Sequence, residues 1–122
     1  MLALLLAALP ILVVPTDAIR QSPDAQRCFA QLLELSGHGR RNDERAAFLT
    51  WEGSGRVGCV VWPATNQHRR ASYRGKWPEN TAAIAHTHPR SQPEPSVQDR
   101  AEARRIGIPI FVVTPERIAI AE

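Results

Sequence analysis

The sequence contains only two cysteines, Cys28 and Cys59, and their spacing is not that of metal ligands. A metal site built on cysteine is therefore excluded. The chain also lacks internal repeats and low-complexity tracts, and its 122 residues suffice for one domain with a small core. Hydrophobic residues make up 43% of the chain, which is typical of a globular domain and excludes a disordered one.

Lysine and arginine are missing before Arg20, and the sequence up to Val14 is almost entirely Leu, Ala, Ile and Val. An apolar run of about 13 residues is too short to span a bilayer but matches the central region of a signal peptide, and Thr16 with Ala18 forms a small-residue cleavage site. This pattern predicts a signal peptide at residues 1–18, a mature domain at residues 19–122, and export to the periplasm or the medium. Because a basic start is missing, an uncleaved anchor, a buried segment of the fold, a misplaced start codon and a cytoplasmic protein stay open.

The two cysteines lie in different predicted elements. Cys28 falls in a helix over residues 23–36 that begins after Ser22, while Cys59 falls in a strand over residues 56–62. If the helix packs on the strand, a disulfide can form in an oxidising compartment. Otherwise Cys28 and Cys59 are two buried thiols, and the sequence does not decide between these states.

Two histidines, His86 and His88, stand at the end of a predicted strand, and Ser96 follows His88 after seven residues. Side chains two apart on a strand point to the same face, and Asp99, just inside the next helix, can reach the same point. Imidazole nitrogens and carboxylate oxygens are ligands that zinc accepts, and three protein ligands leave a fourth position for water. The constellation predicts a metal site at His86, His88 and Asp99 that supports hydrolysis.

The pattern His-x-His-x7-Ser-x-x-Asp resembles the JAMM (MPN+) metalloprotease family, and the order of predicted elements from about residue 43 to the end is similar as well. The resemblance implies that His86, His88 and Asp99 bind Zn²⁺. It also implies that Glu44 is the general acid/base and that Ser96 helps to hold the tetrahedral intermediate. His-x-His-Pro and Pro-Glu-Pro-Ser-x-x-Asp resemble the RadC-like branch of the same superfamily too, so the branch stays open.

Two of these residues also have simpler explanations. Ser96 and Asp99 form a capping box, which by itself indicates only the start of a helix. Glu44 has no fixed spacing to the motif, and Glu52 and Glu79 compete with it for the acid/base role. Both competitors lie in predicted turns, where carboxylates are usually solvated, whereas Glu44 precedes an apolar strand that can lie beside His86.

These features predict a zinc metallopeptidase or isopeptidase acting on a peptide or protein substrate of unknown identity. The alternative is a metal-binding or non-catalytic interaction module of the MPN type. Membrane contact is expected only through an uncleaved N-terminal segment. Nucleic-acid binding is not expected, because a net charge of +3 indicates at most non-specific affinity. A basic stretch interleaved with aromatics is the feature that would favour it: Arg69, Arg70, Tyr73, Arg74, Lys76 and Trp77.

The predicted order of elements is that of an α/β or α+β layered domain, with a mixed sheet flanked by helices. The resemblance narrows this fold to the cytidine deaminase-like architecture of JAMM/MPN domains. Deaminase chemistry itself is excluded, because the sequence has no His-x-Glu with a Pro-Cys-x-x-Cys signature. Helices are expected at residues 23–36 and 96–106, and strands at residues 45–51, 56–62, 71–75, 81–87, 109–114 and 117–121.

Overall fold

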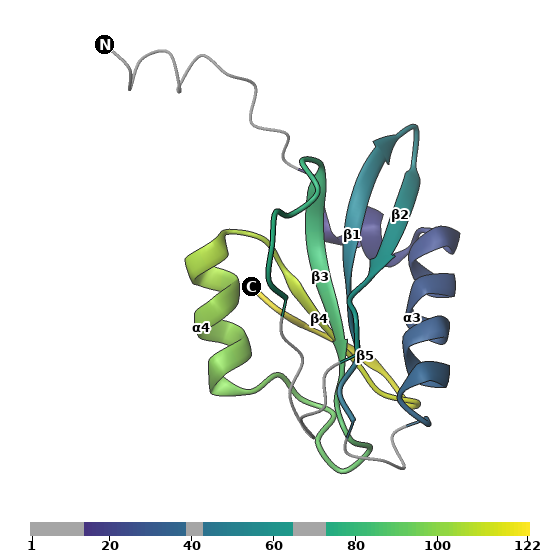
Figure 1. Ribbon diagram of the computed structural model, residues 1–122, viewed down its shortest axis with the longest axis vertical. Coiled ribbons are helices and arrows are strands. Elements are labelled where there is room, and N and C mark those ends of the chain that lie inside the picture. Colours follow the sequence, from purple (N-terminus) through teal and green to yellow (C-terminus); the bar gives the residue numbers. More distant parts are fainter. Residues whose placement is uncertain (1–13, 39–42, 65–72) are drawn as a thin grey trace.

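A five-stranded mixed sheet forms the centre of the protein, with α3 on one face and α4 on the other (Figure 1). The computed structural model describes residues 14–38, 43–64 and 73–122. The order of strands across the sheet is β2-β1-β3-β4-β5. This α+β layered arrangement confirms the predicted fold class. The helices are α2 (Thr16–Arg20), α3 (Pro23–Leu35) and α4 (Val97–Ile106), and the strands are β1 (Ala46–Gly53), β2 (Arg56–Val61), β3 (Thr81–Thr87), β4 (Ile110–Val113) and β5 (Ile118–Ala121).

The strand predicted at residues 71–75 is wrong over its described part, since residues 73–75 form no strand. Residues 71 and 72 lie outside the described residues. Gly75 has a φ of 118°, which interrupts an extended chain, and the ring of Tyr73 packs on Phe48 at a centroid distance of 4.7 Å. A tertiary contact of Tyr73 thus replaces the strand pairing that its β-propensity suggested.

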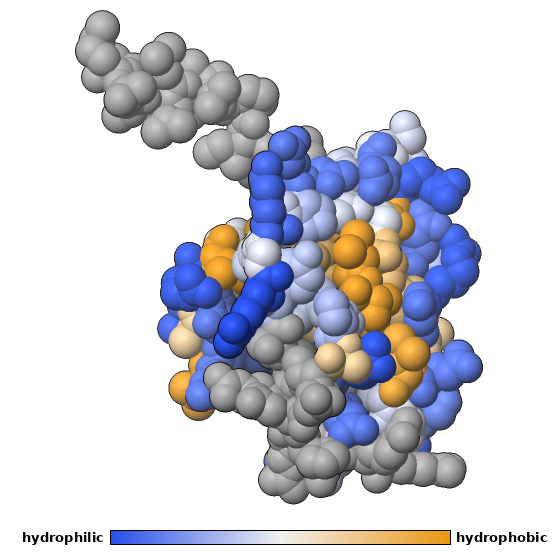
Figure 2. Space-filling view, viewed as in Figure 1, coloured by the Kyte–Doolittle hydropathy of each residue, from blue (hydrophilic) through white to orange (hydrophobic). Residues whose placement is uncertain are grey.

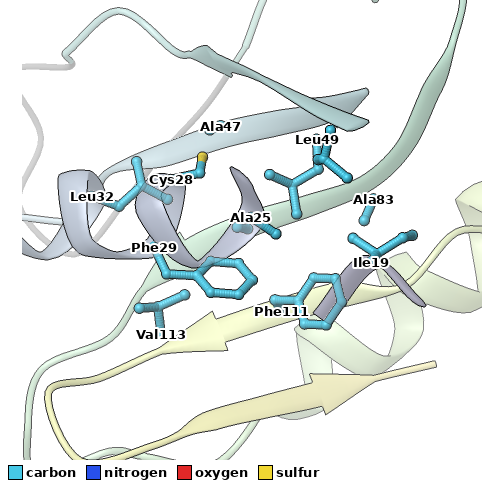
Figure 3. Close-up of a cluster of buried hydrophobic side chains, with 12 residues drawn as sticks. Ile19, Ala25, Cys28, Phe29, Leu32, Ala47, Leu49, Ala83, Phe111 and Val113 are labelled. Atoms are coloured by element: carbon cyan, nitrogen blue, oxygen red, sulfur yellow. The ribbon is translucent and has the colours of Figure 1, made fainter. Parts of the chain in front are cut away.

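The face of the sheet under α3 carries the larger hydrophobic core (Figure 3). The buried residues of α3 recur at helical spacing and point into this face, as the sequence predicts. Phe29 of α3 packs on Phe111 of β4 with 5.4 Å between ring centroids. Alternate residues of the central strands meet the helix because side chains alternate across a strand: Ala47, Leu49, Ala83, Ala85, Phe111 and Val113.

A disulfide joins Cys28 of α3 to Cys59 of β2, with 5.8 Å between the two Cα atoms. This resolves the alternatives that the sequence leaves open, because the helix does pack on the strand. A second link lies close by, where a carboxylate oxygen of Asp24 accepts hydrogen bonds from the Val57 amide at 3.0 Å and the Arg56 guanidinium at 2.9 Å. The hydrogen bond from Val57 holds the pKa of Asp24 below its usual value. Both links hold α3 against the edge strand.

The short helix α2 was not predicted, and it belongs to the core. Ile19 is fully buried in the cluster under α3 (Figure 3). Val14 packs against the same cluster. The amides of Ala18 and Ile19 both donate to the Pro15 carbonyl. The predicted cleavage site after Ala18 therefore lies inside a folded element. No helix in the described ranges is long and apolar enough to cross a membrane.

The crossover from β3 through α4 to β4 determines where the site lies. β3 and β4 are parallel, so the chain leaves β3, passes through α4 and returns to the same sheet. Ligands of such units bind outside the carboxyl ends of the strands. β1 runs antiparallel to β3, and its first residue, Ala46, pairs with His86. The end of β3, the start of α4 and the start of β1 thus meet at one edge.

Candidate metal centre

The two histidines of the motif lie on one face of β3 and its extension. The His88 amide donates to the Val113 carbonyl at 3.1 Å, so the parallel ladder with β4 continues past the end of β3. Thr87 points to the opposite side, where its hydroxyl accepts a hydrogen bond from the Arg45 amide at 3.0 Å. The imidazole rings of His86 and His88 consequently face the same space, with 4.7 Å between their centroids.

His88 is 7% exposed, and its tautomer follows from one contact. Its Nδ1 lies 2.9 Å from the Gln92 carbonyl oxygen. A carbonyl only accepts, so Nδ1 carries a proton and donates this hydrogen bond, which leaves Nε2 to face Asp99. Metal-binding histidines are usually oriented in this way by a carbonyl or carboxylate on their other nitrogen. Sequence reasoning missed Gln92, because a backbone carbonyl leaves no signal in the residue type.

Asp99 caps α4 and also meets both histidines. The Ser96 amide donates to Asp99 Oδ2 at 2.9 Å, and the Asp99 amide donates to Ser96 Oγ at 3.0 Å, which completes the capping box. Asp99 Oδ1 lies 2.9 Å from His86 Nε2, and Oδ2 lies 3.2 Å from His88 Nε2. The cap and the site are therefore compatible, since the cap fixes the direction in which the carboxylate faces.

Glu44 is brought to the same cluster from the chain just before β1. Its Oε2 lies 3.7 Å from His86 Nδ1, and one donor atom each of Glu44, His86 and His88 lie within 4.8 Å of one another. Glu52 lies at the other end of β1, where it accepts hydrogen bonds from Thr50 and Asn80. Glu79 is exposed in a turn. Of the three competing carboxylates, only Glu44 lies beside the histidines.

The cluster is strongly polarised without any bound cation. Burial alone would lower the pKa of His86, but the carboxylates of Asp99 and Glu44 outweigh burial and raise that pKa to about 9. Burial alone would raise the pKa of Asp99, whereas its contacts with His86 and His88 hold that pKa below its usual range. A positive charge beside these carboxylates is therefore favourable, and either a proton on His86 or a metal ion supplies it.

The arrangement fits a metal ion in two respects. Ligands about 2.0–2.2 Å from a tetrahedral zinc lie roughly 3.3–3.5 Å from each other. The Asp99 oxygens already lie 2.9 and 3.2 Å from the two Nε2 atoms. In addition, His86 Nε2 is buried, and its contact with Asp99 Oδ1 at 2.9 Å lacks the alignment of a hydrogen bond. The imidazole nitrogens of His86 and His88 and the Asp99 carboxylate together form a donor set that suits zinc.

A cavity of about 730 Å³ opens beside the cluster. Glu44, His86, His88, Ser96 and Asp99 all line it, so the structure brings every predicted site residue together. Its far wall is aromatic and includes Tyr73 and Trp77, which the sequence placed in a basic stretch. Arg69 and Arg70 of that stretch lie outside the described residues.

Comparison with protein families gives a match over most of the chain. Residues 25–121 match the family of prokaryotic homologs of the JAB domain. No curated protein and no solved structure matches the chain. JAB domains include metal-dependent isopeptidases, and prokaryotic members are often non-catalytic. The matched residues include the His-x-His-x7-Ser-x-x-Asp pattern, so the match confirms the predicted family resemblance.

Proposed function

Because the chain belongs to the prokaryotic JAB domain family, we propose that it is a zinc-dependent peptidase or isopeptidase acting on a peptide or protein substrate. One observation carries the proposal. The Asp99 carboxylate lies 2.9 Å from His86 Nε2 and 3.2 Å from His88 Nε2, and Glu44 adjoins them in a cavity large enough for a peptide segment. Structural metal sites are closed by four protein ligands, whereas three ligands beside a cavity are typical of a catalytic site.

His86, His88 and Asp99 would hold the metal. Two nitrogens and one carboxylate oxygen favour zinc over magnesium or calcium, which prefer oxygen ligands alone. When bound, zinc supplies a Lewis acid that polarises the scissile carbonyl and makes hydroxide available at neutral pH. The Gln92 carbonyl and the capping box hold His88 and Asp99 in the orientation that binding needs.

Glu44 would move the proton. Its carboxylate accepts the proton of the attacking water and then donates it to the nitrogen of the leaving amine, so the proton is conserved through the step. Ser96 Oγ accepts a hydrogen bond from the Asp99 amide, and its own proton stays available to donate to the developing oxyanion. Removal of one such donor costs about 3 kcal/mol of transition-state stabilisation in other enzymes.

A cleavage profile with and without a chelator tests the proposed function. Purified protein is expected to contain about one zinc per chain and to cleave members of a broad peptide mixture. A chelator should stop cleavage, and added zinc should restore it. Metal binding without cleavage of any peptide would instead indicate a non-catalytic module, and a protein that binds no metal would overturn the proposal altogether.

We also propose that the protein is exported, and the Cys28–Cys59 disulfide supports this, because disulfides persist in oxidising compartments. Reduction of the disulfide is expected to lower the free energy of unfolding by about 2–4 kcal/mol, since the link closes a long loop of the unfolded chain. Denaturant unfolding with and without reductant measures the change. Two free thiols in protein purified from its native compartment would contradict the prediction.

Sequencing of the N-terminus of the same preparation addresses the leader. Cleavage after Ala18 would remove the first turn of α2 and place a charged amine on Ile19, which is fully buried. Protein that begins at Ile19 would show that the leader is removed even though a charged amine is then placed at a buried position. An intact Met1 on cytosolic protein would contradict export.

A further inference from the structure

The cavity beside the metal centre has an aromatic wall that the proposed catalytic steps do not use. Trp62, Tyr73 and Trp77 line the cavity, and all three rings pack around Phe48. The centroid distances to Phe48 are 5.1, 4.7 and 5.2 Å, within the range of favourable aromatic pairs. Because Phe48 contacts all three rings, the wall presents a fixed apolar surface.

The register of the sheet places this wall next to the metal centre. Ala46 pairs with His86 on one side, and its carbonyl accepts from the Trp62 amide at 2.8 Å on the other. Paired residues point to the same face, so His86 of β3, Ala46 of β1 and Trp62, just after β2, form a row on one face of the sheet. Neighbouring strands are about 4.8 Å apart, which separates His86 from Trp62 by roughly 10 Å. The methyl group of Ala46 leaves the space between them open.

Further apolar residues line the space above Ala46. Ile84, Ile106 and Ile110 also line the cavity, and the volume of about 730 Å³ lies in the usual range for a small-ligand pocket. The charged residues of the α4 wall, Glu102 and Arg105, bind each other at 2.7 Å. Figure 2 shows hydrophobic residues reaching the surface over β1 and β2, among otherwise hydrophilic surroundings. An apolar group entering the cavity meets these apolar side chains, while the carboxylates that line the cavity are paired with His86, His88 or Arg105.

We propose that this space, the aromatic subsite (Ala46, Trp62, Tyr73, Trp77 and Ile84), binds a large apolar and preferably aromatic side chain of the peptide residue next to the scissile bond. The distance of roughly 10 Å suits a side chain that extends from a backbone held at the metal centre. An acidic side chain would be disfavoured, because it would lose its hydration and face Glu44. The inference rests on the proposed function, since it places the subsite relative to a bond that is cleaved.

Binding and cleavage of a matched peptide series test the subsite. Capped hexapeptides of alanine and glycine carry Phe, Leu, Ala or Asp at one position, and each position is varied in turn. Binding is measured calorimetrically on the zinc-loaded Glu44→Gln variant, so that turnover does not interfere. At one position, the Phe peptide is expected to bind at least about tenfold more tightly than the Ala and Asp peptides, with Leu between them.

Substitutions at the rim identify the wall as the cause. Trp77 is 38% exposed, so Trp77→Ala in that background should leave the fold intact while reducing the preference for Phe to less than about threefold. Trp77→Phe should restore part of the preference. Val97→Ala is the matched control, because Val97 is 85% exposed and does not line the cavity.

The outcomes separate the subsite from the proposed function. Equal or undetectable binding of the Phe, Ala and Asp peptides at every position would overturn the subsite, and so would a preference that Trp77→Ala leaves unchanged. Selective binding of Phe peptides without cleavage of any peptide by the wild-type protein would leave the subsite standing and contradict hydrolysis. Cleavage by the wild-type protein that shows no preference for Phe at any position would contradict the subsite and leave the proposed hydrolysis standing.

Discussion

Replacement of His88 by alanine is expected to remove most of the bound metal and with it all metal-dependent activity. His88 is buried, and its Nε2 faces the Asp99 carboxylate, which also contacts His86 Nε2. Loss of a single outer-shell partner typically costs 10–100-fold in metal affinity, so loss of a ligand should cost at least about 100-fold. Metal content after dialysis and competitive zinc titration measure the change.

His38→Ala is the matched control for this experiment. His38 is exposed and belongs to no cluster of metal-ligating residues in the described part of the chain, so its replacement should leave the metal content unchanged. Asp99→Asn adds a second comparison, because the amide oxygen can still accept the Ser96 amide and keep the helix cap while the negative charge is lost. Full metal content in His88→Ala would contradict the proposed metal site. Asp99→Asn protein that folds but contains little metal would show that Asp99 is a ligand as well as a helix cap.

Replacement of Glu44 by glutamine is expected to lower the rate of hydrolysis by about 10²–10⁴-fold while the metal stays bound. The amide has the same shape as the carboxylate but cannot accept the proton of the attacking water. Glu44 Oε2 lies 3.7 Å from His86 Nδ1, whereas Asp99 contacts His86 and His88 at their Nε2 atoms. Cleavage rates and metal content of the same preparation measure both parts of the prediction.

Glu52→Gln and Glu79→Gln are the matched controls for Glu44→Gln. Both carboxylates lie away from the cavity, so both variants should keep full activity and full metal content. Loss of metal from Glu44→Gln would make Glu44 a ligand, a role that its position in a three-residue donor cluster with His86 and His88 also allows. Full activity of Glu44→Gln would place the acid/base on another residue.

The helix cap at Ser96 illustrates how one pattern can have two meanings. From the sequence, Ser-x-x-Asp is either a capping box or part of a metal site. The structure contains the capping box, and the same Asp99 carboxylate contacts both histidines. A carboxylate has two oxygens with several lone pairs, so it can accept a backbone amide and still face a second partner. Local and functional interpretations of such a motif therefore do not compete.

The family and the positions of His86, His88 and Asp99 could be predicted from the sequence because they depend on short-range rules. Strand alternation places two histidines on one face, and a capping box places Asp99 at the start of a helix. The helix of Cys28 follows from its apolar periodicity in the same way. Each of these rules depends only on residues that lie close together in the sequence.

Only the tertiary structure decided which distant residues share the site. Glu44 reaches His86 because β1 pairs antiparallel with β3, and the aromatic subsite exists because Ala46 lies between His86 and Trp62 in that register. The burial of Ile19 and the Cys28–Cys59 link likewise depend on how α2 and α3 pack on the sheet. Such contacts join residues tens of positions apart, and their geometry is set by strand register and core packing, which no local pattern in a single chain specifies.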